Sequence, residues 1–202
     1  MALESEATLI TGCSTGIGRA TAIRLAEAGR TVYATARNIS AIADLADYGC
    51  ELLALDVTDE ESMVAAVDAV VDRHGAVGAL VNNAGYSQSG AIEDLPMESI
   101  RRQFETNVFG LIRMSQLVLP GMREQRAGRI VNIGSMGGKL SFPGGGIYHA
   151  TKYAVEAISD VLRFEVSNFG VKVVLVEPGL IKTNFADAAL SHMDTPSQTD
   201  GA

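Results

Sequence analysis

Short apolar runs alternate along the chain with longer segments whose apolar residues recur at helical spacing. The runs are rich in β-branched residues and lie at 8–10, 31–34, 51–56, 79–82, 129–133 and 171–176. They are apolar nearly throughout, which is typical of parallel strands buried on both faces. The regular order of strand and helix predicts an α/β fold built on a doubly wound parallel sheet flanked by helices.

Boundary signals place the helices between these runs, at 20–28, 39–48, about 58–74, 99–126 and 148–169. Thr58 is expected to cap the third helix, with Glu61 completing a capping box three residues later. The Pro120-Gly121 pair predicts an end or a kink in the fourth helix, because proline lacks the backbone N–H that a helix interior uses.

Length and composition indicate one soluble globular domain. The 202 residues are 47% hydrophobic, and they contain no repeat or linker, so we expect a single domain over 1–202 with a mobile polar tail at 191–202. The net charge of −8 disfavours nucleic acid and membranes as partners. Cys13 and Cys50 lack metal-ligand spacing. Without a signal-peptide pattern, a cytoplasmic protein with no metal is expected.

A glycine-rich turn joins the first strand to the first helix. Glycines let the backbone turn sharply and approach a pyrophosphate, and the following helix N-terminus offers free N–H groups to the phosphates. A tight structural turn is the alternative, and the strand–turn–helix context favours a cofactor in a Rossmann-like sheet. The expected contacts are Gly12, Ser14, Thr15, Gly16, Ile17 and Gly18.

The residues after the second strand indicate which dinucleotide binds. An acidic residue about 20 positions after the glycines holds the ribose 2′-hydroxyl of NAD. This region carries no acid and presents Arg37, whose guanidinium can pair with a 2′-phosphate. A solvated surface arginine is the alternative. We therefore expect NADP(H) as the cofactor in preference to NAD(H).

Polar and small residues follow the third and fourth strands. Asp56, with Val57, lies where a carboxylate can accept a hydrogen bond from adenine, and a helix-dipole role is the alternative. Asn83, Ala84 and Gly85 would let the cofactor lie against the backbone, while an asparagine side chain ties neighbouring strands; a plain turn is the alternative.

A tyrosine and a lysine at i and i+4, Tyr148 and Lys152, share one helix face. The ammonium is expected to lower the pKa of the phenol, which makes the pair a proton donor to a carbonyl oxygen. Ser135 follows the fifth strand, where its hydroxyl can bind the substrate oxygen or cap a turn. Asn107 is a poor helix former inside a helix; it can hold a bent segment or a water, or lie exposed.

Together these motifs resemble the short-chain dehydrogenase/reductase family, in its single-domain dehydrogenase subfamily. The match covers Thr11-Gly12-x-x-x-Gly16-x-Gly18, the Asn82-Asn83-Ala84-Gly85 segment, Asn107, Ser135, Tyr148-x-x-x-Lys152 and Pro178-Gly179, in family order. The resemblance implies that Tyr148 is the general acid/base, that Lys152 also binds the nicotinamide ribose, that Ser135 polarises the carbonyl and that Asn107 supports a proton-relay water. It also implies that Pro178, Gly179 and Thr183 contact the nicotinamide end.

Two features depart from the family pattern. Thr15 is not basic, so one of the two usual NADP features is missing, and Arg37 supplies the other. The segment after Pro178 is short, whereas the family continues through a further helix and strand. We expect this difference to affect turnover more than cofactor binding.

The resemblance implies a carbonyl or alcohol substrate and a homodimer or homotetramer formed through long helices. The segments 32–37 and 146–152 resemble family members that act on steroids or retinoids. Apolar residues around the expected site favour a hydrophobic ketone or alcohol, and packing in the core is the alternative for about half of them. They are Tyr86, Met136, Leu140, Phe142, Leu180, Ile181 and Phe185. The alternative function is a non-catalytic NADPH sensor or a scaffold protein.

Overall fold

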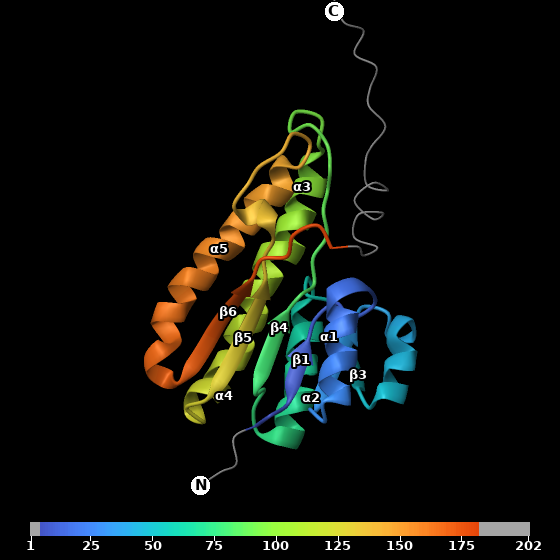
Figure 1. The fold of residues 1–202 in the computed structure, drawn as a ribbon, viewed down its shortest axis with the longest axis vertical. Helices are drawn as coiled ribbons and strands as arrows, with labels where there is room; N and C mark the ends of the chain where they lie inside the picture. Colours follow the sequence, from blue (N-terminus) through green and yellow to red (C-terminus); the bar gives the residue numbers. More distant parts are fainter. Residues whose placement is uncertain (1–4, 182–202) are drawn as a thin grey trace, which may run out of the picture.

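The sheet follows directly from the six apolar runs. The computed structural model describes residues 5–181. Within them the strands pair in parallel in the order β3-β2-β1-β4-β5-β6, which confirms the doubly wound α/β fold (Figure 1). The strands are β1 (Thr8–Ile10), β2 (Val32–Ala36), β3 (Glu51–Ala54), β4 (Ala79–Asn82), β5 (Gly128–Ile133) and β6 (Val171–Val176).

Helices connect each strand to the next. The α-helices are α1 (Gly16–Glu27), α2 (Glu60–His74), α3 (Met97–Phe104), α4 (Gly110–Glu124) and α5 (Gly146–Val166). Shorter helical turns are η1 (Ile39–Tyr48), η2 (Glu105–Phe109), η3 (Met136–Gly138) and η4 (Ser167–Phe169), of which η2 is a π-helical turn and the others are 3₁₀. Within the described residues, a helical segment thus connects each strand to the next one along the chain, as parallel pairing requires.

The core lies on both faces of the sheet. Leu9 and Ile10 of β1 are fully buried, and as strand neighbours they point to opposite faces. Leu9 joins a cluster built from α2, α4 and the end of α5, whereas Ile10 joins one built from α1 and η1. Burial on both faces fixes the central strands, whose carboxyl ends face the upper edge in the view of Figure 1.

The outer strands are not buried on both faces. The expectation that all six strands are buried in this way is therefore wrong for the edges of the sheet. Within residues 5–181, β3 and β6 are the edges of the sheet. Val171 and Val173 of β6 are buried, while Val174 and Val176 are about 40% exposed. The apolar pattern alone does not distinguish an edge strand from a central one, because it records composition and not neighbours.

Three helix predictions also need correction. Asp59, not Thr58, caps α2, because its carboxylate accepts from the backbone N–H of Glu61 and Ser62. Pro120 lies inside α4, which continues to Glu124, so the predicted helix end at this proline is wrong and the kink stays a prediction. The segment expected as one helix over 99–126 is divided by the π turn η2. The predicted tail 191–202 lies outside the described residues.

Candidate active site

A cleft of about 860 Å³ opens at the carboxyl ends of the strands, beside the point where the strand order reverses between β1 and β4. Most of the predicted site residues line it: Gly12, Ser14, Thr15, Gly16, Ile17, Arg37, Asp56, Val57, Asn83, Ala84, Gly85, Ser135, Tyr148, Lys152, Pro178 and Gly179. Gly18 and Asn107 lie behind this lining and support it. Thr183 falls outside the described residues.

The glycine-rich turn leaves the start of α1 open toward the cleft. Gly12 and Gly16 have φ of 73° and 61°, a backbone region that L side chains rarely adopt. Thr15 is the N-cap of α1, and no side chain accepts a hydrogen bond from its first turn. The free N–H groups of that turn, with the positive end of the helix dipole, fit an anionic group such as a pyrophosphate.

Asn83 fastens this turn to β4. Its amide nitrogen donates to the carbonyls of Thr11 and Gly12, both at 2.9 Å. The Thr11 hydroxyl accepts from the backbone N–H of Asn83 and of Ala84, at 3.0 and 2.9 Å. A Cβ at Gly18 would overlap the Asn83 amide and would lie 2.6 Å from the Gly12 carbonyl. Gly18 is therefore required for packing behind the turn.

At the far end of the cleft, Arg37 directly follows β2 and is exposed. No ion pair to Arg37 occurs among the described residues, so the guanidinium is available to an anionic ligand. Asp56 follows β3, and its Oδ1 accepts from the backbone N–H and the hydroxyl of Thr58 at 2.9 and 2.8 Å. These contacts hold the Asp56 carboxylate at the rim of the cleft.

Asn107 is buried in the π turn η2, where it joins three segments. Its Oδ1 accepts from the Tyr86 N–H at 3.0 Å, and its Nδ2 donates to the Tyr86 carbonyl at 2.9 Å. Nδ2 also lies 3.1 Å from the Thr151 hydroxyl. A π turn widens a helix locally and is frequent at functional sites. Asn107 thus ties the segment after β4 to α5, one residue before Lys152.

Tyr148 lies in the first turn of α5, with Lys152 one turn later. The buried Lys152 Nζ donates to the Ile133 carbonyl at 2.8 Å and lies 5.8 Å from the centre of the Tyr148 ring. Burial lowers the pKa of Lys152 to about 8. Ser135, at the end of β5, accepts from the Gly137 N–H at 3.0 Å, and its hydroxyl also hydrogen-bonds the Tyr148 phenol.

The pKa of Tyr148 was expected to be lowered by Lys152, but in this structure it is raised. Burial raises the pKa of the phenol above its ordinary value, and the hydrogen bond to Ser135 lowers it in part. The reason is that the Lys152 ammonium is directed to the Ile133 carbonyl, while the phenol lies in a desolvated part of the cleft. The phenol therefore holds its proton through neutral pH.

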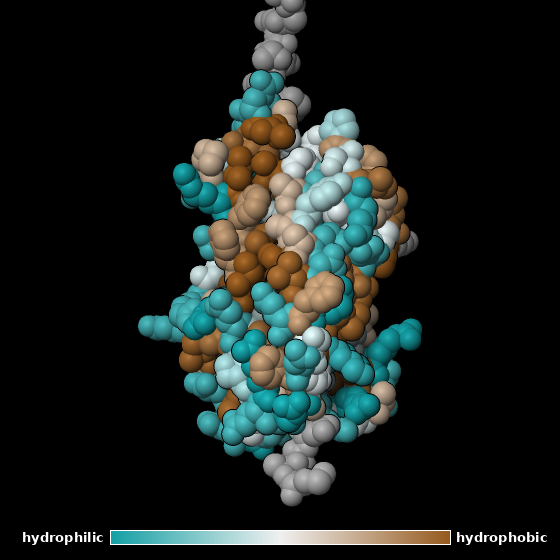
Figure 2. Space-filling model, turned by 90° about the vertical axis from the view of Figure 1, so that its left-hand side faces the viewer, coloured by the Kyte–Doolittle hydropathy of each residue, from teal (hydrophilic) through white to brown (hydrophobic). Residues whose placement is uncertain are grey.

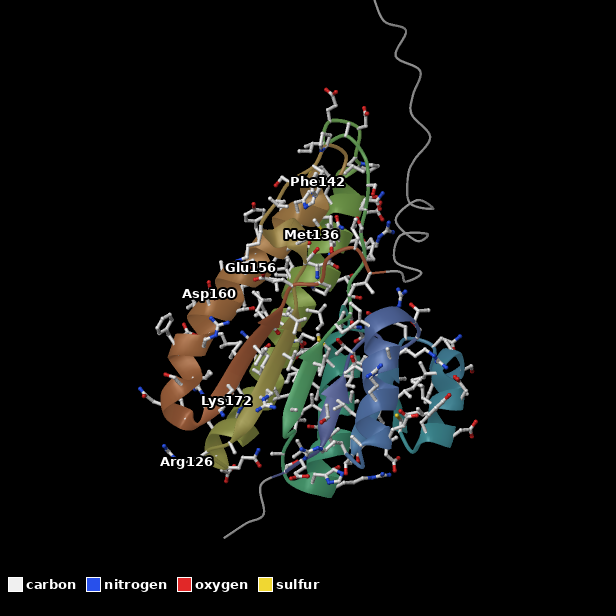
Figure 3. The ribbon with its side chains drawn as sticks, in the orientation of Figure 1. Arg126, Met136, Phe142, Glu156, Asp160 and Lys172 are labelled. Atoms are coloured by element: carbon white, nitrogen blue, oxygen red, sulfur yellow. The ribbon has the colours of Figure 1, made fainter. Side chains whose placement is uncertain are left out.

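Five of the seven residues expected to line the substrate site lie in the same cleft as Tyr148 and Ser135. Tyr86, Met136, Phe142, Leu180 and Ile181 line it, and Figure 3 shows Met136 and Phe142 close to the start of α5. Leu140 is exposed and does not line the cleft, and Phe185 lies outside the described residues. Polar side chains line the cleft as well, among them Arg102 and Thr106.

Sequence reasoning missed two buried residues of α5 that lie near these groups. His149 is buried and contacts the segment after Ser135 through both ring nitrogens. Glu156 is nearly buried on α5 and pairs with Lys139. The signal available for both was their spacing from Lys152 on one helix, but neither residue type is specific to a supporting role.

Comparison with known proteins now identifies the class. Residues 6–194 match the family model described as short chain dehydrogenase, so the chain belongs to the short-chain dehydrogenase/reductase family and is an oxidoreductase of that family. Members act on small molecules with a nicotinamide cofactor, and the cleft fits such a dinucleotide through the open start of α1 and the glycines around it.

Individual relatives agree with this assignment. The chain is 40% identical to a 3-ketodihydrosphingosine reductase of Bacteroides thetaiotaomicron, over 92% of this chain and 67% of the relative. A short-chain dehydrogenase structure from Streptomyces avermitilis is 46% identical, with a TM-score of 0.85 over 89% of this chain and 68% of that one. Other similar structures hold NADP+ or NAD.

Residues 5–181 contain neither a cluster of metal ligands nor a helix that could span a membrane. No group of three or more His, Cys, Asp or Glu residues in this part of the chain could hold a metal ion. None of its helices has both the length and the apolar character needed to cross a membrane.

Proposed function

We propose that this protein is an NADP(H)-dependent oxidoreductase that interconverts a carbonyl group and a secondary alcohol. The observation that carries the proposal is the meeting of Ser135, Tyr148 and Lys152 in one cleft with the open start of α1. Ser135 follows β5, whereas Tyr148 and Lys152 lie on successive turns of α5. All three line the same cleft as the glycine-rich turn before α1.

We assign to these residues the roles that the family resemblance implies. A nicotinamide cofactor held in the cleft would supply or accept the hydride. In the reducing direction Tyr148 donates its proton to the carbonyl oxygen, and the Ser135 hydroxyl donates a hydrogen bond to the same oxygen as negative charge develops. Lys152 places positive charge beside the phenolate that forms and binds the nicotinamide ribose. Asn107 supports a water that returns a proton toward Lys152.

Preference for NADP(H) rests on Arg37. Its position after β2, its exposure and the lack of a carboxylate partner among residues 5–181 suit an arginine that binds a 2′-phosphate. Pro178, Gly179 and Thr183 serve the nicotinamide end, and Asp56 and Val57 the adenine end.

The substrate we propose is a hydrophobic ketone or alcohol, of the steroid or retinoid kind, that would pack against Met136, Phe142 and Leu180 in the cleft. The sphingolipid-related name of one relative is compatible with a long apolar substrate. A panel of aliphatic, cyclic and polar ketones tests this: turnover that rises with apolar size supports it, and preference for small polar ketones contradicts it.

A titration with NADPH and NADH, followed by nicotinamide fluorescence, tests the cofactor. NADPH should bind more tightly than NADH, and R37A should weaken NADPH binding by about tenfold or more while leaving NADH unchanged. R24A is the control, because Arg24 is exposed on α1 and does not line the cleft. Equal binding of both nucleotides would contradict the preference.

We also propose that the chain is one domain that works as a homodimer or homotetramer in the cytoplasm. Figure 2 shows a largely apolar stretch on the side of the molecule where α5 lies, and Tyr153, Val161 and Phe164 of α5 are exposed there, Phe164 by 81%. Ile158 and Leu119 line a groove between α5 and α4. A monomeric mass by light scattering would contradict this assembly.

A further inference from the structure

A buried carboxylate lies beside the proposed catalytic groups and takes no part in the chemistry described so far. Glu156 follows Lys152 by one turn of α5 and Tyr148 by two, so it shares their side of the helix. Only 8% of the residue is exposed. Its Oε2 lies 2.6 Å from the Nζ of Lys139, a residue whose own side chain is 55% exposed.

The second oxygen of this carboxylate packs under the segment that carries Ser135. Glu156 Oε1 is buried and has no hydrogen-bond partner among the described residues. It lies so close to η3 that a Cβ at Gly138 would be 2.8 Å away, and one at Gly134 would be 3.4 Å away. The carboxylate therefore sets how near η3 can approach α5, and hence how near Ser135 lies to Tyr148.

Lys139 connects this carboxylate to the end of β6. Its Nζ is 3.4 Å from Glu177 Oε1, and Glu177 precedes the Pro178-Gly179 pair of the cleft. Backbone hydrogen bonds also join the segment of Ser135 to the end of β6. The N–H of Gly134 donates to the Val176 carbonyl at 2.7 Å, and the N–H of Met136 donates to the Pro178 carbonyl at 3.0 Å. One ammonium thus joins α5, the segment of Ser135 and the segment of Pro178.

An ordinary surface ion pair would contribute little. The pairs Arg30–Glu6, Arg73–Glu51 and Arg163–Asp160 are of that kind, with both partners well exposed. Lys139–Glu156 differs because one partner is buried. Removing Lys139 would leave a desolvated charge directly beneath η3, and an unpaired buried charge destabilises its surroundings strongly.

We propose that Lys139, through Glu156, is a positioning residue for the Ser135–Tyr148 pair. It neutralises the buried carboxylate and keeps η3 seated on α5, so that the Ser135 hydroxyl reaches the phenol. Neither Lys139 nor Glu156 lines the cleft, so both act through other residues. The expected change in kcat rests on the proposed function, whereas the expected change in the Tyr148 titration does not.

The test compares K139M, K139R, E156Q and the K139M/E156Q double variant with the wild-type protein. The controls are K172M and D160N, because Lys172 and Asp160 are exposed residues of β6 and α5 and lie well away from Met136 (Figure 3). The first readout needs no substrate. The titration of Tyr148 is followed by phenolate absorbance, as the difference between each variant and its Y148F counterpart.

K139M should move the Tyr148 titration to higher pH, because displacement of Ser135 removes the hydrogen bond that lowers the phenol pKa. K139R should restore the wild-type titration. The double variant should resemble E156Q alone, since the two residues act as one pair. With a carbonyl substrate in hand, K139M should lower kcat by about tenfold or more while NADPH binding changes by less than about twofold.

Wild-type titration of Tyr148 in K139M, with kcat equal to that of K172M, would overturn the proposal. So would additive effects of K139M and E156Q, because independent residues add. If K139M does not fold, the Tyr148 titrations of E156Q and K139R decide whether the Lys139–Glu156 pair positions Ser135. A wild-type protein that reduces no carbonyl contradicts the proposed function, and the absorbance readout still decides the positioning role.

Discussion

The Nδ1 atom of His149 lies 3.0 Å from the carbonyl oxygen of Gly137, and this contact fixes where the imidazole carries its proton. The backbone N–H of Phe142 donates to Nε2 at 3.1 Å, so Nε2 bears no hydrogen in the neutral ring. Nδ1 therefore holds the proton and donates it to Gly137. The ring closes residues 137–142, which follow Ser135, into one loop held against α5.

We expect H149F to destabilise the protein and lower turnover, because it leaves the Gly137 carbonyl and the Phe142 N–H without partners. The loss should be about 1–3 kcal/mol in the free energy of unfolding, measured by urea unfolding. H149N can still donate to Gly137 and should be intermediate. If H149F unfolds at the wild-type urea concentration and turns over normally, the ring has no holding role.

Y148F should abolish carbonyl reduction and preserve cofactor binding, because the phenol is the proposed proton donor and its ring remains to pack in the cleft. The expected loss in kcat/KM is about a hundredfold or more, with NADPH binding by fluorescence unchanged. Y153F is the matched control, since Tyr153 is exposed on the next turn of α5. A Y148F enzyme with the normal rate would show that the acid is another group.

Carbonyl reduction should have a flat pH profile through neutrality and a falling alkaline limb. The reason is that burial raises the pKa of Tyr148, and the reducing direction needs the protonated phenol. S135A removes a hydrogen bond that lowers this pKa, so its limb should move to higher pH while kcat/KM falls. Burial also lowers the pKa of Lys152 to about 8, so the alkaline limb reports the loss of the ammonium and of the phenol proton together. A limb that moves to lower pH in S135A would contradict this account.

K152M should stabilise the fold while it removes activity. Burial lowers the pKa of Lys152 from 10.5 to about 8, so the unfolded chain holds the extra proton between these values and wild-type stability rises with pH through that window. Below about pH 8 the buried charge costs up to about 3 kcal/mol, which K152M avoids.

Thermal unfolding of K152M and wild type between pH 7 and 10 measures this difference. The advantage of K152M should be largest at pH 7 and should shrink as pH rises. K172M replaces an exposed lysine and should show neither effect. An advantage for K152M that grows with pH would mean that the ammonium is not destabilised by burial.

Most of the cofactor end of the cleft could be predicted from sequence because it depends on local structure. Gly12 and Gly16 must adopt positive φ wherever the turn forms, and the first turn of α1 follows at once. The strand runs also predict the parallel sheet, since a run such as 79–82 that is apolar on both sides needs cover on both sides. These features are contained in a few consecutive residues.

The supporting contacts were decided by the tertiary structure. Asn83 reaches Thr11 and Gly12 from about 70 positions away along the chain. Lys139 meets Glu156 because η3 packs against α5, and it meets Glu177 because β6 lies beside β5. The direction of the Tyr148 pKa likewise depends on burial and on where Lys152 points. The sequence determined which chemical groups are present and their local backbone, whereas their desolvation and partners arise from packing between distant segments, which no local pattern records.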